Sequence, residues 1–279
     1  MEELSPKKLL GEFLRSRRQR LSPEQVGLVN YGRRRTSGLR REEVAQLAHI
    51  GTSWYTSLEQ GREVNPSQDV LDHIARALQL TEDERQYLHV LAKPAQREEK
   101  TEDEQQQLQT GMQRTVMALE PNPAFVLDPY WNLTAWNRAA AFVFHLPAFS
   151  AANDYQINWI KHLLSGDRLG TDTQERNEKA QAIIAQFRAD YAQSPNDVIF
   201  QKLVDEFQQT IPIFRERWPM HDVQAVKDRF KHFDDPRIGV MEFEHIVLHP
   251  SGNPMMKMMI YTASLDTATR LQAMLKAGV

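Results

Sequence analysis

Residues 38–62, GLRREEVAQLAHIGTSWYTSLEQGR, predict two short helices joined by a tight turn. The first, over about residues 40–49, carries apolar side chains at the three-to-four spacing of one helix face: Val44, Leu47 and Ala48. The second, over about residues 52–60, should bury Tyr55 and Leu58 and end at Gly61, a residue typical of helix C-termini. Gly51, in the link, is expected to allow the sharp turn. This pattern is typical of a helix-turn-helix, which places its second helix in the major groove of DNA.

Four short polar residues should face outward from the second helix: Thr52, Ser53, Thr56 and Ser57. Their hydroxyl and methyl groups are suited to base edges. Basic residues near this helix are expected to contact phosphate or a base edge: Arg33, Arg34, Arg35, Arg40, Arg41 and Arg62. We therefore predict that these ten residues form a DNA interface.

The distribution of charge supports this prediction. The whole chain has a formal net charge of −3, but residues 7–41 contain eleven basic and two acidic side chains, a local net charge of +9. The remainder therefore carries −12. A charge run is often only a solvated surface, but one that leads into a two-helix pattern supplies the electrostatic attraction that DNA binding requires.

The flanking segments predict a five-helix domain over residues 1–92. The first helix should bury four apolar residues, Leu9, Leu10, Phe13 and Leu14, while Arg15 and Arg18 on its other face contact phosphate. Another helix is expected over residues 67–78. Thr81 and Glu84 form the capping box of a fifth helix that ends near Ala92.

The order of several segments resembles a known family. LGEFLRSRRQRLSPEQVGL, GRRRTSGLRREEVAQLA, WYTSLEQGR and NPSQDVLDHIARALQLTEDERQYLHVLA follow one another, as later do PAFVLDPYWNLTAWNRAA, VDEFQQTIPIFRERWPMHDV and PRIGVMEFEHIVLHPSG. They resemble the MmyB-like transcription regulators, bacterial proteins with a Cro/repressor-type (XRE) helix-turn-helix and a PAS-like ligand-binding domain. The chain departs from that family at Gly51, where Ser is common, and at Ser57, where Arg is common. The second departure removes a cation from the recognition helix, so an operator sequence cannot be carried over.

Residues 93–110 are dense in Glu and Gln and nearly free of large apolar side chains, which predicts a charged linker or the solvated start of a helix. The chain has no cysteine, which excludes disulfides and thiolate metal sites. It also has no apolar run long enough to span a bilayer and no signal-peptide core at its N-terminus. We therefore expect a cytoplasmic protein without membrane insertion.

Residues 111–279 predict an α+β, PAS-like domain with an antiparallel sheet and covering helices. Residues 125–127 and 131–135 should form one hairpin, with a helix starting at Asn137, and residues 238–248 and 255–262 a second antiparallel pair. Helical periodicity is expected over residues 174–193, 196–217 and 267–275. Asp234 and Asp235, which precede Pro236, are interpreted as a turn.

The resemblance implies that this domain holds a small apolar molecule, with fatty-acid-like ligands the favoured class. Large aromatic and thioether side chains are suited to line such a pocket, although they are equally typical of a packed core: Trp136, Phe142, Phe144, Phe187, Phe214, Trp218 and Met258. A ligand carboxylate would suit Arg188 or Arg215, and Asn137 or His221 could supply a neutral hydrogen bond. Each of these four is equally compatible with a structural role.

The sequence contains no catalytic constellation and no metal-ligand or phosphate-loop motif. We therefore expect neither an enzyme nor a cofactor other than the possible ligand. Two hypotheses remain for the C-terminal half. It either binds an apolar ligand and modulates operator binding in a homodimer, or it serves only dimerisation or protein contacts. In both cases double-stranded DNA is the expected partner of the N-terminal half.

Overall fold

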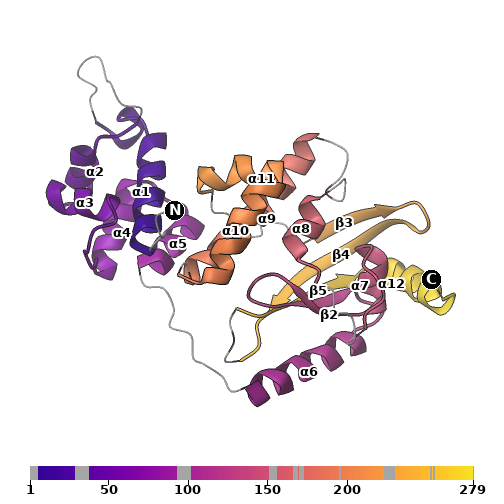
Figure 1. The fold of residues 1–279 in the computed structure, drawn as a ribbon. Helices are drawn as coiled ribbons and strands as arrows, with labels where there is room; N and C mark the ends of the chain where they lie inside the picture. The colour runs from indigo at the N-terminus through magenta and orange to yellow at the C-terminus, as the bar shows by residue number, and fades with distance from the viewer. Residues whose placement is uncertain are drawn as a thin grey trace. The chain divides into compact units, whose positions relative to one another are not determined.

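The computed structural model describes residues 6–28, 38–92, 102–150, 156–165, 169, 173–194, 196–222, 230–251, 253 and 255–278. The chain divides into two compact units. The first comprises residues 1–96 and 169–225, and the second comprises residues 97–168 and 226–279. Figure 1 shows that the first unit is helical and that the second contains the sheet. The polypeptide therefore enters the sheet unit, returns to the helical unit, and then completes the sheet.

The five predicted N-terminal helices are confirmed: α1 (Pro6–Arg20), α2 (Arg41–Leu47), α3 (Thr52–Glu59), α4 (Gln68–Ala77) and α5 (Glu82–Ala92), with a short 3-10 turn η1 (Glu24–Val26) after α1. Side chains cap three of them, and in α2 the Arg40 amide donates to Glu43 Oε2 at 2.6 Å. The Val70 amide donates to Ser67 Oγ at 3.4 Å, and the amides of Thr81 and Glu84 donate to each other's side chains at 2.9 and 3.3 Å. These caps satisfy amides that the first helical turn leaves without partners.

The turn between α2 and α3 differs from the prediction. Gly51 has extended backbone angles, with φ −69° and ψ 135°, and is the N-cap residue of α3. The left-handed residue is His49, with φ 55°. The expectation that Gly51 makes the turn is therefore wrong. At the other end of α3, Gly61 has φ 69°, and the Arg62 amide donates to Ser57 O at 3.0 Å, as expected of a glycine C-terminus.

Three further helices belong to the first unit: α9 (Thr173–Gln193), α10 (Val198–Thr210) and α11 (Pro212–Arg217), which a 3-10 turn η2 (Trp218–Met220) follows. The predicted helix over residues 196–217 is divided at Ile211–Pro212, because proline lacks the amide that would continue α10. Their core is aromatic and consists of Phe187, Tyr191, Phe200, Phe207, Phe214 and Trp218. We call residues 173–222 the helical insert.

The second unit is built on one antiparallel sheet with the order β2-β1-β5-β4-β3. Its strands are β1 (Ala124–Leu127), β2 (Leu133–Trp136), β3 (Phe230–Asp235), β4 (Gly239–Leu248) and β5 (Lys257–Ala263). Both predicted antiparallel pairs are present, with Phe125 opposite Trp136 and Ile246 opposite Ile260. Strand β3 was not predicted. Asp234 and Asp235 end this strand, and the turn follows them, so their interpretation as a turn is wrong.

Helices flank this sheet: α6 (Glu102–Ala118), α7 (Arg138–Val143), α8 (Trp159–Leu164) and α12 (Leu265–Lys276). Successive strand residues point to opposite faces, so each face has its own core. One core joins α6 to the sheet through Met112, Val116, Val126, Met258 and Ile260. The other carries Phe125 on β1 and Tyr261 on β5, whose ring centroids are 6.1 Å apart. The predicted linker over residues 93–110 is helical from Glu102 onward, and the predicted domain limits remain a prediction.

Two glycines in helices allow one substitution to be compared in two environments. A Cβ on Gly11 would lie 2.3 Å from Glu59 O, because α1 and α3 cross in close contact there. A Cβ on Gly111 meets nothing within 4 Å. We expect Gly11→Ala to destabilise the first unit by about 1–3 kcal/mol and Gly111→Ala to stabilise α6 by about 0.5–1 kcal/mol. Urea unfolding of both variants measures this, and equal effects would contradict the close crossing.

Candidate nucleic-acid interface and ligand face

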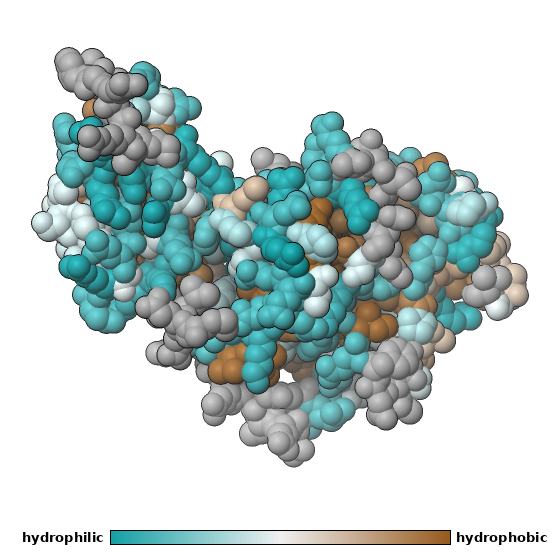
Figure 2. All heavy atoms as spheres, turned by 45° about the horizontal axis from the view of Figure 1, so that its top comes forward, coloured by the Kyte–Doolittle hydropathy of each residue, from teal (hydrophilic) through white to brown (hydrophobic). Residues whose placement is uncertain are grey.

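Helix α3 has a buried side and a solvent-facing side. Tyr55, Leu58 and Glu59 are buried against the other helices. Thr52 and Ser53 are exposed, and Thr56 and Ser57 are half-buried. On the face drawn in Figure 2, the N-terminal helices are mostly hydrophilic. Thr52 and Ser53 thus form a short, exposed polar surface, with the half-buried Thr56 and Ser57 beside them, whose hydroxyl groups can donate to and accept from base edges.

Glu59 anchors the buried side of α3. Its carboxylate accepts from Arg18 Nε and Nη2 at 2.7 and 2.8 Å, and from Arg41 Nε at 2.9 Å. Arg18 also donates to Leu39 O at 2.6 Å. Burial would raise the pKa of Glu59, but the hydrogen bonds and positive charges of Arg18 and Arg41 outweigh burial and hold this pKa below its ordinary value. The ion pairs join α1, α2 and α3, so they set the position of the recognition helix.

The predicted phosphate contacts have different environments. Arg18 is buried, so the expectation that it faces phosphate is wrong. Arg41 is both paired and accessible: its guanidinium binds Glu59, while its side chain remains 37% exposed to solvent. Arg40 and Arg62 are exposed. Arg33, Arg34 and Arg35 lie outside the described residues. Sequence reasoning did not find the ion pairs of Glu59, because its partners are separated from it by 18 and 41 residues.

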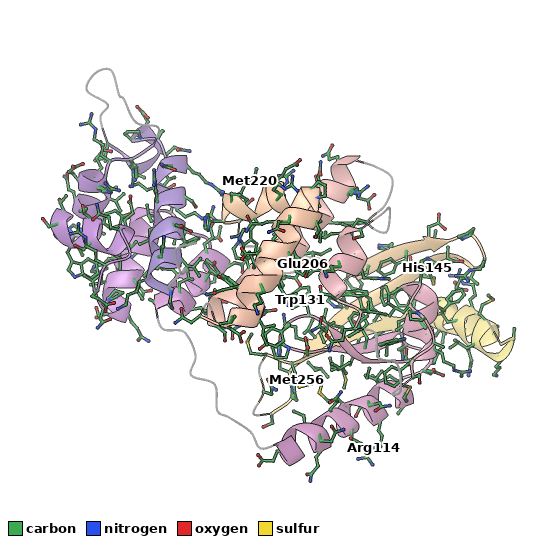
Figure 3. All side chains as sticks on the ribbon, viewed as in Figure 1. Arg114, Trp131, His145, Glu206, Met220 and Met256 are labelled. Carbon is green, nitrogen blue, oxygen red and sulfur yellow. The ribbon has the colours of Figure 1, made fainter. Side chains whose placement is uncertain are left out.

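Six of the eleven predicted ligand-binding residues belong to the helical insert, whose α10 and η2 are marked by the labels Glu206 and Met220 in Figure 3. Phe187, Phe214 and Trp218 contact one another in its aromatic core. Arg215 donates to the carbonyls of Gln208 and Gln209 at 2.7 Å and so caps the end of α10.

The two remaining residues of this group are also held by the protein itself. Arg188 is 2% exposed, lies 4.1 Å above the Trp218 ring and donates to Trp218 O. His221 has φ 51° and ends η2. Burial and three nearby arginines lower the pKa of His221 to about 3. Its imidazole is therefore neutral at physiological pH, whereas Arg188 and Arg215 of the insert bind backbone carbonyls.

The other five predicted residues lie in the sheet unit. Asn137 is a structural group, since its side chain forms four hydrogen bonds at 2.9–3.2 Å to backbone atoms. Trp136 donates to Pro147 O at 2.7 Å, and Phe142 lies under the guanidinium of Arg237 at 4.0 Å. Met258 packs in the α6 core, whereas Phe144 contacts the opposite, aromatic face. The five predicted residues of the sheet unit are therefore divided between the two faces of the sheet.

Phe144 lies among further rings on the aromatic face of the sheet, and the sequence did not single out Phe233, Phe243 or Tyr261 for a site. Tyr261 lies at the centre of this face, with ring centroids of Phe144, Phe243 and His245 at 4.9, 6.2 and 4.7 Å. Others complete the group: Phe125, Trp159 and Phe233. We call these seven residues the aromatic face. The alternation of Phe243 with Glu242 and Glu244 was visible in the sequence, but not the strand order that joins β4 to β1 through β5.

His245 is the polar group of the aromatic face. Burial, together with the charge of Lys231, lowers the pKa of His245 to about 4. Its Nε2 is buried and has no hydrogen-bond partner among the described atoms. A buried ring nitrogen without a hydrogen-bond partner is costly unless a ligand or water satisfies it. This atom is therefore a candidate hydrogen-bonding position for a molecule that enters the aromatic face.

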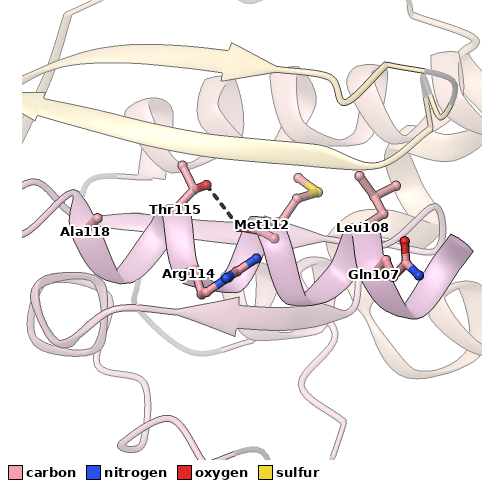
Figure 4. A pocket seen from close by; sticks show the side chains of 7 residues that line it. Gln107, Leu108, Met112, Arg114, Thr115 and Ala118 are labelled. Atoms are coloured by element: carbon pink, nitrogen blue, oxygen red, sulfur yellow. Dashed lines mark hydrogen bonds between the residues drawn. The ribbon is translucent and has the colours of Figure 1, made fainter. Parts of the chain in front are cut away.

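A shallow groove of about 700 Å³ runs along α6 (Figure 4). Its lining residues all come from this helix: Gln107, Leu108, Gly111, Met112, Arg114, Thr115 and Ala118. Thr115 Oγ1 donates to Gly111 O at 3.0 Å within the helix. The groove is open to solvent, and the eleven predicted ligand-binding residues are not among its lining.

Among the residues that the structure describes, no group of three or more metal-ligating side chains is placed to hold a metal ion. Within the same residues, no helix has the length and apolar character needed to cross a bilayer.

Comparison with known proteins assigns both halves of the chain. Residues 9–88 match a family described as a helix-turn-helix domain. Residues 108–275 match the MmyB-like transcription regulator ligand binding domain. No curated protein matches the chain. The second match covers more than half of the chain and includes the helical insert, and both agree with an exposed α3 and a five-stranded sheet with helices. The chain therefore belongs to the MmyB-like transcription regulators.

Proposed function

We propose that the chain reads an operator with α3 as a homodimer, and that a small apolar, fatty-acid-like molecule bound on the aromatic face modulates this reading. The observation that carries the DNA part is the geometry of α3. Its outer side presents Thr52 and Ser53, while Glu59 on the opposite side is fixed by two arginines. A rigid helix with a free polar surface is what major-groove readout requires.

A charge placed on the outer side of α3 tests this geometry. Thr52→Glu adds a carboxylate to the first turn of α3, where the helix dipole favours a negative charge, so the fold should persist. The phosphates of DNA should repel this carboxylate. We expect affinity for a duplex selected from a random pool by the wild-type protein to fall by about tenfold or more. Thr269→Glu, the same substitution on exposed α12, is the control. Equal affinities of both variants, measured by fluorescence anisotropy, would contradict the assignment of α3.

The aromatic face supports the ligand part. It offers rings from four strands and from residues next to α7 and at the start of α8, which is the apolar lining expected of a small-molecule site. The rings contact one another, so a ligand must displace some of them. The neutral His245 suits a protonated carboxyl or a hydroxyl group better than it suits a carboxylate. Arg188 and Arg215, the predicted carboxylate partners, already bind backbone carbonyls.

Native mass spectrometry followed by denaturing release tests ligand and homodimer together. A dimer that releases a fatty-acid-sized molecule, or whose melting temperature rises with added palmitate, supports the proposal. His245→Phe should reduce the palmitate shift while the protein remains folded. A dimer without an adduct and without any response to a lipid panel would favour the alternative, in which the C-terminal half serves only assembly. A monomer in light scattering, both free and on DNA, would exclude the homodimer.

A further inference from the structure

The helical insert belongs in sequence to the ligand-binding family region, residues 108–275, yet it packs in the same compact unit as the DNA-reading helices. We propose that the insert is the element through which the ligand-binding region holds the DNA-reading helices α1–α5, and that it does so by docking on α1 and α5. We call these five helices the head. This proposal concerns the regulation of the proposed function and rests on it.

Asp222, which follows η2, provides the first part of the docking contact. Arg20 Nη2 donates to Asp222 Oδ1 at 2.7 Å, and Arg17 Nη1 lies 3.8 Å from the same oxygen. Gln181 of α9 donates to Asp222 Oδ2 at 2.9 Å, which ties the carboxylate to the insert. One carboxylate of the insert therefore binds two cations of α1.

Backbone carbonyls of the same turn complete this contact. Arg17 donates to His221 O, and Arg20 donates to Met220 O. His221 has a left-handed backbone conformation, φ 51°, where η2 ends. A non-glycine residue adopts this conformation at some cost, which the surrounding contacts must offset. The shape of the turn is thus fitted to the arginines of α1.

The second part of the contact is buried between α5 and α9, which pack together. Tyr87 of α5 is buried and interacts with Arg188 of α9. Burial lowers the pKa of Arg188, and the nearby Tyr87 and Asp222 only partly offset this effect. Burial also lowers the pKa of Arg17 of α1, while the charges of Glu84 on α5 and, across the interface, of Asp222 act in the opposite direction. Buried guanidinium groups with partners across an interface indicate a close contact, because each loses its hydration there.

The insert also has the internal core needed to act as one body. The rings of Phe187, Phe207 and Phe214 have centroids 5.4–6.0 Å apart and connect α9, α10 and α11. A displacement at one end of such a packed element is transmitted to the other end, because packed cores do not deform continuously. The insert therefore links the ligand-binding region to the head without depending on the chain between Ala92 and Glu102.

A cut in the chain tests the docking without any ligand. A specific protease site is placed between Ala92 and Glu102 of the full-length protein, and the cleaved protein is passed over a gel-filtration column. We expect the two fragments to elute together. Separation of the wild-type fragments at micromolar concentration would overturn the proposal, whatever the outcome of the ligand experiments.

Matched charge reversals locate the contact. Asp222→Arg should weaken the association of the cut fragments by about 30-fold or more, because it places a cation against Arg17 and Arg20. Glu175→Arg, on the exposed start of α9 where its partner is Lys179 of the same helix, should leave the association unchanged. Equal dissociation constants for both variants would overturn the assignment of Asp222.

The regulatory part is measured on uncut protein. If palmitate changes the DNA affinity of the wild-type protein, the Asp222→Arg protein should bind palmitate with the same affinity as wild type. Its DNA affinity, however, should no longer change when palmitate is added. A retained response would overturn the role of the insert. A wild-type protein that does not respond to palmitate would instead count against the proposed ligand, and the cleavage result would still decide whether the insert docks.

Discussion

Glu59→Gln is expected to lower the free energy of unfolding of the first unit by about 3–5 kcal/mol, because it leaves buried Arg18 without a counter-charge. The Glu59 side chain is fully buried, so solvent cannot replace the lost interaction. Urea unfolding gives the change in stability. The affinity for DNA should fall together with the stability, because α3 loses its connection to α1 and α2.

Glu63→Gln is the matched control for this substitution. Glu63 also binds a cation, Lys7, but its side chain is 87% exposed. Exposed pairs of this kind contribute about 0–1 kcal/mol. A Glu59→Gln protein as stable as Glu63→Gln would show that the buried ion pairs do not hold the recognition helix.

The contribution of Glu59 should also depend on pH. Its pKa in the folded protein lies below the ordinary value of 4.5, so the native state stabilises the ionised form. This stabilisation is complete above pH 4.5 and is lost as the pH falls through the lowered pKa. The stability difference between wild type and Glu59→Gln should therefore be constant near neutrality and narrow in acid, where the protonated carboxyl resembles the amide. A difference that widens in acid would contradict the direction of the pKa shift.

Asn137→Ala is expected to destabilise the sheet unit by about 3 kcal/mol or more. Asn137 is 1% exposed, and its side chain accepts from the amides of Ala124 and Ala140 and donates to two carbonyls, Val116 O and Asn122 O. Truncation removes all four hydrogen bonds, and each buried group left unpaired costs about 1–3 kcal/mol. The residue joins α6, β1 and α7, so its loss should reduce the cooperativity of the unit as well as its midpoint in urea.

Asn196→Ala provides the comparison, because Asn196 is exposed at the turn before α10. A surface substitution of this type should change stability by no more than about 0.5 kcal/mol. If both alanine variants unfolded at the same urea concentration, the hydrogen bonds of Asn137 would not be structural, and its predicted role at a ligand would regain support.

Most of the local elements of this protein could be predicted from the sequence alone. Periodicity and capping residues predicted the N-terminal helices, and Thr81 and Gly61 act at their ends as expected. Alternation predicted β4, and turn residues predicted the hairpin of β1 and β2. These signals are local, because a cap or a turn involves residues within a few positions of one another. The outward surface of α3 followed from the same periodicity.

Tertiary structure decided the arrangement that gives those elements their roles. Arg18 and Glu59 are 41 residues apart, and Arg17 and His221 are 204 apart, so no local pattern could reveal either pairing. Strand β3 was not predicted because three of its six residues are exposed and its sequence, FKHFDD, does not alternate between apolar and polar residues. The aromatic face exists only because β5 lies between β1 and β4. Long-range pairing depends on how the whole chain buries its apolar surface. That burial is the sum of many weak contacts between distant residues, so no single stretch of sequence reveals it.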